Sequence, residues 1–406
     1  MTNSQTSDVV GRIFSSWKRG RAALLYGPPG TGKTHAMSEL FSSLDGASVV
    51  TVDPRETANQ ALSEAHLLPP IPDPHVREWI TFHQSYSYEE FVVGLRPAPA
   101  VGGGVTLQPR MGRLLDLAWR VSDPSDPIAA AVLCIDELNR GNAAGIFGEL
   151  ITYLDADYRA DAAGGTNPLA IPMHLPGVGA ASGNPSETEP LIASDGSRVA
   201  LPRPWFFPHH VYIVASMNSV DRSAIPLDSA LARRFDRIEL RADPLTLARW
   251  LGLDSGAVDR ARTTIRSADS ANEEAWTLKS AEECAVLLLE HLNYLIGEDI
   301  GDDFQLGHGL LRPVVDSPAR ERWGALGRCW DDVLLPQLQE RYQGRPDLLA
   351  RTLRLADPPP SGPTLIAPDT SPLMGRTSGR RAQPVLLEGH PDAGRALCWL
   401  LMQPGG

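Results

Sequence analysis

Short apolar runs recur through the first 240 residues and are separated by segments in which apolar residues follow a helical spacing. The runs predict strands at Ala22–Tyr26, Ser48–Val52, Trp79–His83, Val132–Asp136, Val211–Ala215 and Arg237–Leu240. Strands that are apolar along most of their length suit a parallel sheet covered by helices on both faces. The alternation of strands and helices therefore predicts an α/β fold with a doubly wound parallel sheet.

Helical spacing dominates the second part of the chain. PLTLARWLGL, SAEECAVLLLEHLNYLI and RCWDDVLLPQLQERY each repeat apolar residues at helical intervals, and the same spacing upstream predicts one helix over Ala143–Leu154. We therefore expect an α/β domain over residues 1–242 and a helical lid domain over residues 243–355. Residues 356–406 open with DPPPSGP, which is typical of a linker, and end in a short helix that we expect to dock back onto the body.

Two stretches interrupt the α/β pattern. Residues 53–130 form an insertion that contains TFHQSYSYEEFVVGLRP, in which a short strand leads into a capped helix start. Its aromatic residues are expected mainly to pack the core: Phe82, Tyr86, Tyr88 and Phe91. Residues 156–205 are rich in Gly, Pro, Ala and Ser without periodicity, so we expect a flexible loop and hypothesise that it contacts a pore or a partner.

A glycine-rich motif follows the first strand. AALLYGPPGTGKT combines an apolar strand, a G-x-x-x-x-G-K-T loop and the start of a helix. Glycine permits a backbone that turns N–H groups toward phosphate oxygens, and the helix N-terminus adds partial positive charge. Lys33 is expected to reach the β- and γ-phosphates, and the Thr34 hydroxyl to ligate Mg²⁺. The candidate nucleotide-binding residues are Gly27, Pro28, Pro29, Gly30, Thr31, Gly32, Lys33, Thr34 and His35.

Two later strands end in side chains that suit hydrolysis. AVLCIDE ends in Asp136, which we expect to orient Mg²⁺ through water, and Glu137, which we expect to polarise the attacking water. HVYIVASMN ends in Asn218, an amide suited to orienting that water. Downstream, RRFD places Arg233 and Arg234 at a helix end. This pair is either a solvated helix terminus or an arginine finger that acts on the nucleotide of a neighbouring subunit.

Composition limits the class of partner. The formal charge of −12 argues against a chain that coats nucleic acid by bulk electrostatics, so DNA is expected to be contacted only indirectly or through an assembled ring. The four cysteines form no CxxC pair, which indicates neither a zinc site nor a disulfide framework. No apolar run approaches the roughly 20 residues that span a bilayer, and no signal-peptide core is present. We therefore expect a cytoplasmic protein without membrane association.

The order of these motifs resembles the AAA+ ring ATPases, and the wider pattern resembles the McrB family, the NTPase motors of modification-dependent restriction systems. The resemblance rests on TFHQSYSYEEFVVGLRP, IDELNRGNAAGIFGELITYLD, MNSVDRSAIPLDSALARRFDRIEL and the lid-like HLNYLIGEDIGDDFQLGHGLL and VLLPQLQERY. It implies a Mg²⁺-dependent NTPase that assembles into a homo-oligomeric ring, expected to be a hexamer. It also implies that ATP or GTP hydrolysis drives a McrC-like nuclease in defence against foreign DNA.

The resemblance assigns further residues. The Asn-Arg pair that follows the acidic motif in the family falls on Asn139 and Arg140, and Arg140 is expected to act across the subunit interface. The later Asp-Arg pair falls on Asp221 and Arg222.

The family's run of arginines falls on Arg233 and Arg234, but Ala232 replaces one of its members, which leaves open which arginine contacts phosphate. Only the short segment Met1–Arg21 precedes the first strand, so we expect the separate DNA-reading domain of many McrB proteins to be missing.

Other functions are compatible with the same motifs. A MoxR-like remodelling chaperone that acts on a protein client would use the same nucleotide chemistry. A scaffold controlled by nucleotide binding alone ranks last, because both carboxylates needed for hydrolysis are present. Phosphate-loop chemistry does not distinguish ATP from GTP.

Overall fold

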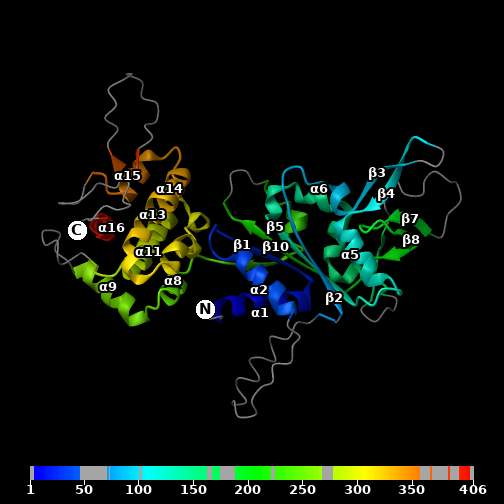
Figure 1. Ribbon diagram of the computed structural model, residues 1–406, viewed down its shortest axis with the longest axis horizontal. Coiled ribbons are helices and arrows are strands. Elements are labelled where there is room, and N and C mark those ends of the chain that lie inside the picture. The colour runs from blue at the N-terminus through cyan, green and yellow to red at the C-terminus, as the bar shows by residue number, and fades with distance from the viewer. Residues whose placement is uncertain are drawn as a thin grey trace, which may run out of the picture. The chain divides into compact units, whose positions relative to one another are not determined.

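The computed structural model describes residues 4–45, 71–72, 74–99, 103–161, 167–173, 188–220, 225–267, 278–356, 366–367, 383–384 and 393–402. These residues fall into two compact units (Figure 1). The sheet unit comprises the described residues of Thr2–Tyr26 and Lys33–Glu239, and the helical unit comprises Gly27–Gly32 with those of Leu240–Gly406. The phosphate loop therefore belongs to the helical unit, whereas the helix that follows it belongs to the sheet unit. The domain boundaries predicted at residues 242 and 355 stay predictions.

The sheet unit is built on five strands in the order β11-β1-β10-β5-β2. The pairs β1/β11, β5/β10 and β2/β5 are parallel, as the apolar runs predict. The strands are β1 Ala22–Gly27, β2 His75–Thr81, β5 Ala130–Asp136, β10 Val211–Asn218 and β11 Asp236–Glu239. The predicted strand Ser48–Val52 lies outside the described residues. The predicted strand Trp79–His83 is shifted: β2 is an edge strand paired from His75, and its polar first residues hide it from an apolar pattern.

Helices cover both faces of this sheet, which confirms the α/β fold class. On one face lie α1 Ser4–Arg19 and α2 Lys33–Asp45; Trp17 packs on Tyr212 with ring centroids 5.4 Å apart, and its indole N–H donates to the Ile213 carbonyl. On the other face, α5 Arg113–Ser122 packs on β5 and β10 through buried leucines. Alternate strand residues are buried on each side, so the sheet separates two apolar layers.

The predicted helix over Ala143–Leu154 is wrong in its continuity. The chain forms α6 Ala143–Phe147 and then a 3-10 segment, Gly148–Leu154. Gly148 has φ +51°, a left-handed conformation that ends the α-helix. The apolar side chains that suggested one helix are nevertheless buried, as Phe147 and Leu150 show. Hydrophobic spacing therefore located the core face correctly and missed the break.

The insertion keeps its aromatic residues in the core, as predicted. Phe82 and Phe91 are fully buried and meet edge to face, with centroids 5.5 Å apart, while Tyr86 and Tyr88 pack partly buried against them. The predicted capped helix is a single turn, α4 Tyr88–Phe91, with Ser87 and Glu90 in a capping box. The residues that follow are not helical, because Val93–Pro99 pair as a strand.

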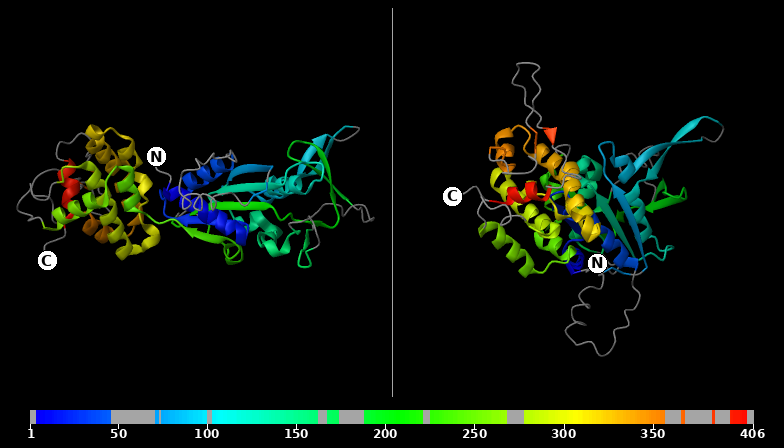
Figure 2. Two further views of the ribbon diagram at one scale, coloured as in Figure 1. Left: turned by 90° about the horizontal axis from the view of Figure 1, so that it is seen from below. Right: turned by 60° about the vertical axis from the view of Figure 1, so that its left-hand side comes forward.

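A second sheet, with the order β3-β4-β7-β8, was not predicted. It contains β3 Val93–Pro99, β4 Val105–Met111, β7 Thr188–Ile192 and β8 Arg198–Pro202, and the β3–β4 hairpin extends away from the helices of its own unit (Figures 1 and 2). The described parts of 156–205, where a flexible loop was predicted, include the β7–β8 hairpin, which small residues conceal in the sequence. The short strands β6 Pro172–Met173 and β9 Trp205–Phe206 pair with each other as well.

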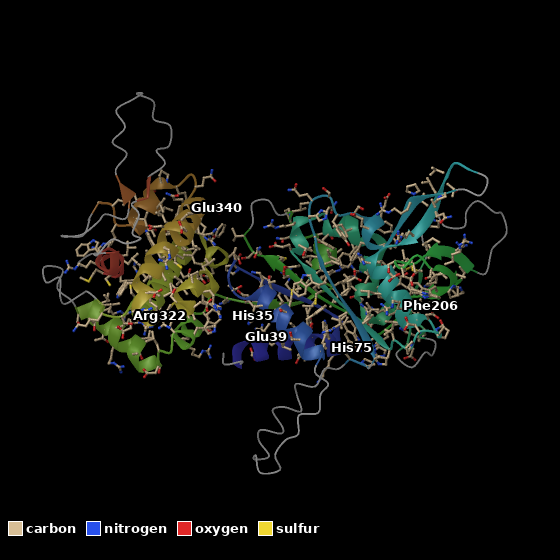
Figure 3. The ribbon with its side chains drawn as sticks, viewed as in Figure 1. His35, Glu39, His75, Phe206, Arg322 and Glu340 are labelled. Atoms are coloured by element: carbon tan, nitrogen blue, oxygen red, sulfur yellow. The ribbon has the colours of Figure 1, made fainter. Side chains whose placement is uncertain are left out.

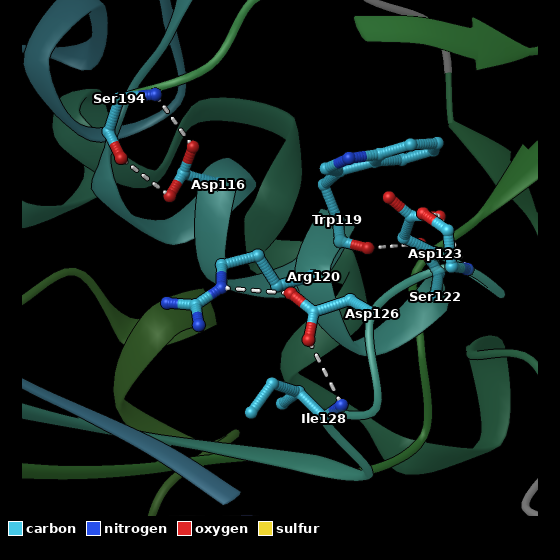
Figure 4. Close-up of polar contacts among 9 residues, drawn as sticks. Asp116, Trp119, Arg120, Ser122, Asp123, Asp126, Ile128 and Ser194 are labelled. Atoms are coloured by element: carbon cyan, nitrogen blue, oxygen red, sulfur yellow. Dashed lines mark hydrogen bonds and ion pairs between the residues drawn. The ribbon is translucent and has the colours of Figure 1, made fainter. Parts of the chain in front are cut away.

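The turn of the β7–β8 hairpin is tied to α5. The buried Asp116 carboxylate accepts hydrogen bonds from the Ser194 backbone N–H and hydroxyl, both at 2.8 Å (Figure 4). One turn further along, Arg120 pairs with Asp126 at 3.3 Å, which fixes the end of the same helix. The segments 162–166 and 174–187 lie outside the described residues, so the pore-loop hypothesis stays a prediction.

The helical unit packs around α11 Ala281–Ile300, whose leucines 288, 289 and 292 are fully buried. Its tail helix, α16 Ala393–Leu401, docks against α11 and brings Cys398 Sγ to 4.0 Å from Cys284 Sγ, so the predicted docking of the C-terminal helix is confirmed. No helix in the described ranges is long and apolar enough to cross a bilayer.

The remaining α-helices of the described residues are shorter than α11. They are α7 Ser229–Ala232 in the sheet unit, and α8 Pro244–Trp250, α9 Ser255–Ser267, α12 Arg312–Asp316, α13 Arg322–Cys329, α14 Leu335–Arg341 and α15 Pro346–Thr352 in the helical unit. Two short strands, β12 Ile366–Ala367 and β13 Gln383–Pro384, pair with each other.

Candidate nucleotide site

The phosphate loop follows β1 and leads into α2, as the motif predicts. Gly30 has φ +80° and Gly32 has φ +89°, and both angles lie in the left-handed region that glycine adopts without strain. The Thr31 hydroxyl donates to the Pro28 carbonyl at 2.9 Å, and Thr31 is buried. The loop is therefore closed by a hydrogen bond from one of its own side chains to its backbone, and the N-terminus of α2 follows it directly.

Lys33 is the first residue of α2 and is only 7% exposed. Burial lowers the pKa of its ammonium group to about 8, while the nearby carboxylates of Glu137 and Asp136 act in the opposite direction. The structure thus brings Lys33 together with the two acidic residues that the sequence singled out. Thr34 and His35 are exposed, and His35 lies on α2 beside Glu39, with 3.2 Å between Nε2 and Oε1 (Figure 3).

Asp136 and Glu137 stand where β5 ends, beside Ser216 of the neighbouring strand β10. The Ser216 hydroxyl donates to Oδ1 of Asp136, and the Glu137 backbone N–H reaches the same Oδ1 at 3.2 Å and Ser216 Oγ at 3.3 Å. Sequence reasoning missed Ser216. The signal that could have found it is its position two residues before Asn218, which places both side chains on the same side of one strand.

Glu137 adopts a left-handed backbone with φ +57°, which is uncommon for a residue other than glycine and stores strain. Its carboxylate is held from two sides. The Asn218 side-chain amide lies 3.2 Å from both Oε1 and Oε2, and Arg140 Nε donates to Oε2 at 3.2 Å. The structure therefore gathers Glu137, Asn218 and Arg140 into one polar cluster at the carboxyl edge of the sheet.

Asn139 supports this cluster from behind. Its side-chain N–H donates to the Asn218 carbonyl at 3.0 Å, and its own carbonyl accepts from the Ile225 N–H at 2.8 Å. Asn139 is 6% exposed, and its Oδ1 has no protein hydrogen-bond partner. This asparagine thus fixes the end of β10 relative to the acidic turn, while Arg140 beside it is exposed.

The two finger candidates differ in their surroundings. Arg234 is mostly buried and pairs within its own chain, with Nε 3.0 Å from Asp155 Oδ2 and Nη1 2.9 Å from the Ala230 carbonyl. Arg233, at the C-terminal end of α7, is exposed. Arg222 and Asp221 lie outside the described residues, so the expectation for them stays a prediction.

A polar cavity of about 340 Å³ adjoins the acidic turn. It is lined by Arg140 and by three residues that follow β2, namely His83, Gln84 and Ser85. The Phe82 N–H donates to the Asp136 carbonyl at 3.0 Å, which anchors this segment to β5. No residue pattern in TFHQSYSYEEFVVGLRP indicates that this segment borders the candidate site, because the contact arises only when β2 pairs with β5.

Family comparisons agree with this geometry. The AAA domain (dynein-related subfamily) matches residues 22–235, which is more than half of the chain, and the McrB alpha-helical lid domain matches residues 285–350. The chain is a McrB-like member of the AAA domain family. This membership confirms the resemblance drawn from the motifs and assigns the chain to the AAA+ nucleoside triphosphatases.

Two characterised relatives carry restriction names. The Type IV methyl-directed restriction enzyme EcoKMcrB subunit of Escherichia coli (strain K12) is 28% identical over 217 residues, which cover 53% of this chain and 34% of that protein. The Type II restriction enzyme BsuMI component YdiS of Bacillus subtilis (strain 168) is 22% identical over 251 residues, covering 57% and 60%. The match thus spans less than two thirds of either relative.

Among solved structures, NtrX from Brucella abortus aligns with 88% of this chain and 65% of its own length at 13% identity. The TM-score of 0.25 is too low to support an argument from that alignment.

Proposed function

We propose that this McrB-like chain binds ATP or GTP at the phosphate loop, hydrolyses it with Mg²⁺ in a homo-oligomeric ring, and couples hydrolysis to a McrC-like nuclease in DNA restriction. The observation that carries the proposal is the cluster of Lys33, Asp136, Glu137 and Asn218 within one unit. It combines a cation for phosphate oxygens, a carboxylate for a metal ion and a carboxylate with an amide for a water molecule.

The donor set at the end of β5 fits magnesium. Both hydrogen bonds that the described residues donate to the Asp136 carboxylate end on Oδ1, which leaves Oδ2 as the oxygen that a metal-bound water can approach. The exposed Thr34 hydroxyl is a second hard oxygen donor. When bound, Mg²⁺ would neutralise charge on the β- and γ-phosphates. Burial lowers the pKa of Lys33 to about 8, so its ammonium group is still largely protonated near neutral pH and would contact those phosphates directly.

Glu137 is the proposed general base. The strained backbone points its carboxylate toward Asn218, whose amide is close to both carboxylate oxygens and so limits rotation of the group. A water held between the carboxylate and the terminal phosphate would donate its proton toward Glu137 as it attacks. Asn218 orients the carboxylate, and through it the water, without taking a proton itself.

The arginines support action between subunits. Arg234 is committed to Asp155 inside its own chain, whereas Arg233 is exposed at the end of α7. An arginine finger must extend from the surface of its own subunit to the nucleotide of a neighbouring subunit, where it stabilises charge on the phosphoryl group that is transferred. We therefore propose Arg233 as the finger and Arg234 as a structural residue. The exposed Arg140 would move from Glu137 to a neighbouring subunit when the ring forms.

The partner is proposed from the relatives. Both relatives are named as parts of restriction enzymes, and residues 285–350 match the McrB alpha-helical lid domain. These matches favour a nuclease partner over the client protein of a MoxR-like chaperone. DNA contact by the nuclease, or by the assembled ring, is compatible with the net charge of −12 on this chain.

The deciding experiment measures phosphate release by the purified chain with ATP and with GTP, with and without Mg²⁺, alone and with a McrC-like nuclease from the same organism. We expect Mg²⁺-dependent turnover that a nuclease partner stimulates. Turnover that is indifferent to the nuclease would refute the restriction proposal and favour the chaperone. Absence of turnover with both nucleotides would refute the proposed NTPase.

A further inference from the structure

The helical unit holds the phosphate loop by backbone contacts from a Gly-His-Gly segment. Gly307 donates its N–H to the Pro29 carbonyl at 3.1 Å, and Gly309 donates its N–H to the Gly30 carbonyl at 2.7 Å. All four residues belong to the same compact unit. Two successive carbonyls of the phosphate loop are therefore fixed by two N–H groups that come from a distant part of the chain.

This approach leaves no room for side chains. A Cβ atom at Gly307 would lie 2.1 Å from the Gly30 carbonyl carbon and 2.4 Å from the Pro29 oxygen, and one at Gly309 would lie 2.7 Å from the Gly30 oxygen. Gly307 has φ −69°, which any residue can adopt. Glycine is thus required at position 307 for proximity and not for its conformational freedom.

The Gly-His-Gly segment is itself rigidly supported. Buried Asn293 of α11 donates to the Leu306 carbonyl at 2.9 Å and accepts from its N–H at 2.6 Å. His308 is 4% exposed, accepts from the Asp243 N–H at 3.3 Å through Nδ1, and packs on Trp250 with centroids 5.0 Å apart. The Gly-His-Gly segment is therefore a rigid support for the phosphate loop.

We propose that Gly307 and Gly309 are positioning residues that aim the phosphate loop at the nucleotide. In a planar trans peptide the carbonyl and the next N–H point in opposite directions. Anchoring the Pro29 carbonyl therefore turns the Gly30 N–H away from the Gly-His-Gly segment, and anchoring the Gly30 carbonyl does the same for the Thr31 N–H. These donors are fixed on the side from which phosphates bind. The inference rests on the proposed nucleotide site and adds that the helical unit sets its affinity.

The test compares alanine at Gly307, at Gly309 and at Gly324, in the full chain. Gly324 is the matched control, because it lies in α13 and a Cβ there meets nothing closer than 3.6 Å. Dissociation constants for non-hydrolysable ATP and GTP analogues are measured together with kcat and KM. Gly307→Ala is expected to raise Kd and KM by about tenfold or more, Gly309→Ala by less, and Gly324→Ala by neither, while kcat changes less than about threefold.

The order of effects is the signature of positioning, since it follows the depth of each overlap. Circular dichroism and thermal unfolding check that each variant is folded; if Gly307→Ala does not fold, Gly309→Ala decides by the same measurements. Unchanged Kd and KM in a folded variant that carries the overlap would overturn the inference while leaving the NTPase proposal intact. If the wild-type chain bound neither analogue, the proposed nucleotide site would fall and this inference with it.

Discussion

The two units fix their candidate functional groups by different means. In the sheet unit the chemical groups are side chains, and they are fixed by other side chains, as when Asn218 holds the carboxylate of Glu137. In the helical unit two carbonyls of the phosphate loop are fixed by backbone N–H groups, those of Gly307 and Gly309. In the sheet unit, a substitution that preserves the shape of a side chain should leave the fold intact but abolish the chemical role of that side chain. In the helical unit, Gly307 and Gly309 have no side chain that could react, but a Cβ atom added at either position would overlap the phosphate loop.

The difference predicts which kinetic constant each region controls. Side chains that meet the water and the terminal phosphate act in the transition state, so their loss lowers kcat. Backbone donors that surround phosphates act on bound substrate as well, so their displacement raises Kd and KM. Substitutions in the sheet unit and in the Gly-His-Gly segment therefore give opposite kinetic signatures if both assignments hold.

The largest expected effect is that of Glu137→Gln. Glutamine keeps the shape and can still accept from Asn218, but it cannot take the proton of the attacking water, so kcat should fall by about 10³-fold or more. Kd for either nucleotide and assembly should stay within about twofold of wild type. Phosphate release and analogue binding, measured side by side, check both halves. A near-normal rate of phosphate release in this variant would show that Glu137 is not the general base.

Arg233→Ala should follow in size. Removing an arginine finger costs about 10³-fold in kcat, whereas Arg234→Ala should mainly lower stability, because it breaks the ion pair with Asp155. Mixing provides a sharp test of action between subunits. Chains that carry Glu137→Gln and chains that carry Arg233→Ala, each inactive alone, should regain part of the activity when co-assembled. If mixed assemblies of confirmed composition recover no hydrolysis activity, Arg233 does not act at the nucleotide site of a neighbouring subunit.

Much of the sheet unit could be predicted, because its strands are buried on both faces and read as unbroken apolar runs. Asp136, Glu137 and Asn218 stand at or just beyond strand ends, and Lys33 begins the helix that follows β1. A parallel sheet therefore gathers these residues at one edge. The β7–β8 hairpin was hidden by its small residues. Asp195 and Gly196, between two short alternating runs, were the available turn signal.

Other features depend on contacts between distant segments and left no local trace. Gly307 and Gly309 look like turn glycines in the sequence, and only the approach of Pro29 and Gly30 gives them a role. The same holds for the separation of Arg233 from Arg234: two adjacent identical residues differ because Asp155 lies near one of them. Such pairings are set by tertiary packing, which the sequence pattern of a single segment does not encode.

Asn218→Ala should have an intermediate effect. Without the amide the Glu137 carboxylate can rotate, so kcat should fall by about 10- to 100-fold with little change in Kd. Asn142→Ala is a matched control, because this nearby asparagine only caps α6, through its bond from the Gly145 N–H at 3.2 Å. Equal losses of kcat in the two variants would indicate a general loss of order instead of a specific role for Asn218.

The smallest expected effect concerns pH and belongs to the helical unit. Burial lowers the pKa of His308 from 6.5 to about 4, where Asp243 acts to raise it and Arg249 to lower it. The folded chain therefore keeps this imidazole neutral while the unfolded chain protonates it below pH 6.5, so the free energy of unfolding decreases as pH falls. At about 1.36 kcal/mol per pH unit, this histidine accounts for about 2 kcal/mol between pH 6.5 and pH 5.

His308→Gln should remove that part of the pH dependence, because glutamine can accept from the Asp243 N–H but does not titrate. Urea unfolding of both chains at pH 7 and pH 5 measures the change in the free energy of unfolding. The difference between the two chains isolates the contribution of His308, because the other histidines contribute equally to both. His308 lies between the two glycines that hold the phosphate loop, but its imidazole stays neutral in the folded chain at pH 5, so the change in nucleotide affinity between pH 7 and pH 5 should be equal in the two chains. An equal loss of stability in both chains would show that protonation of His308 does not account for this part of the pH dependence.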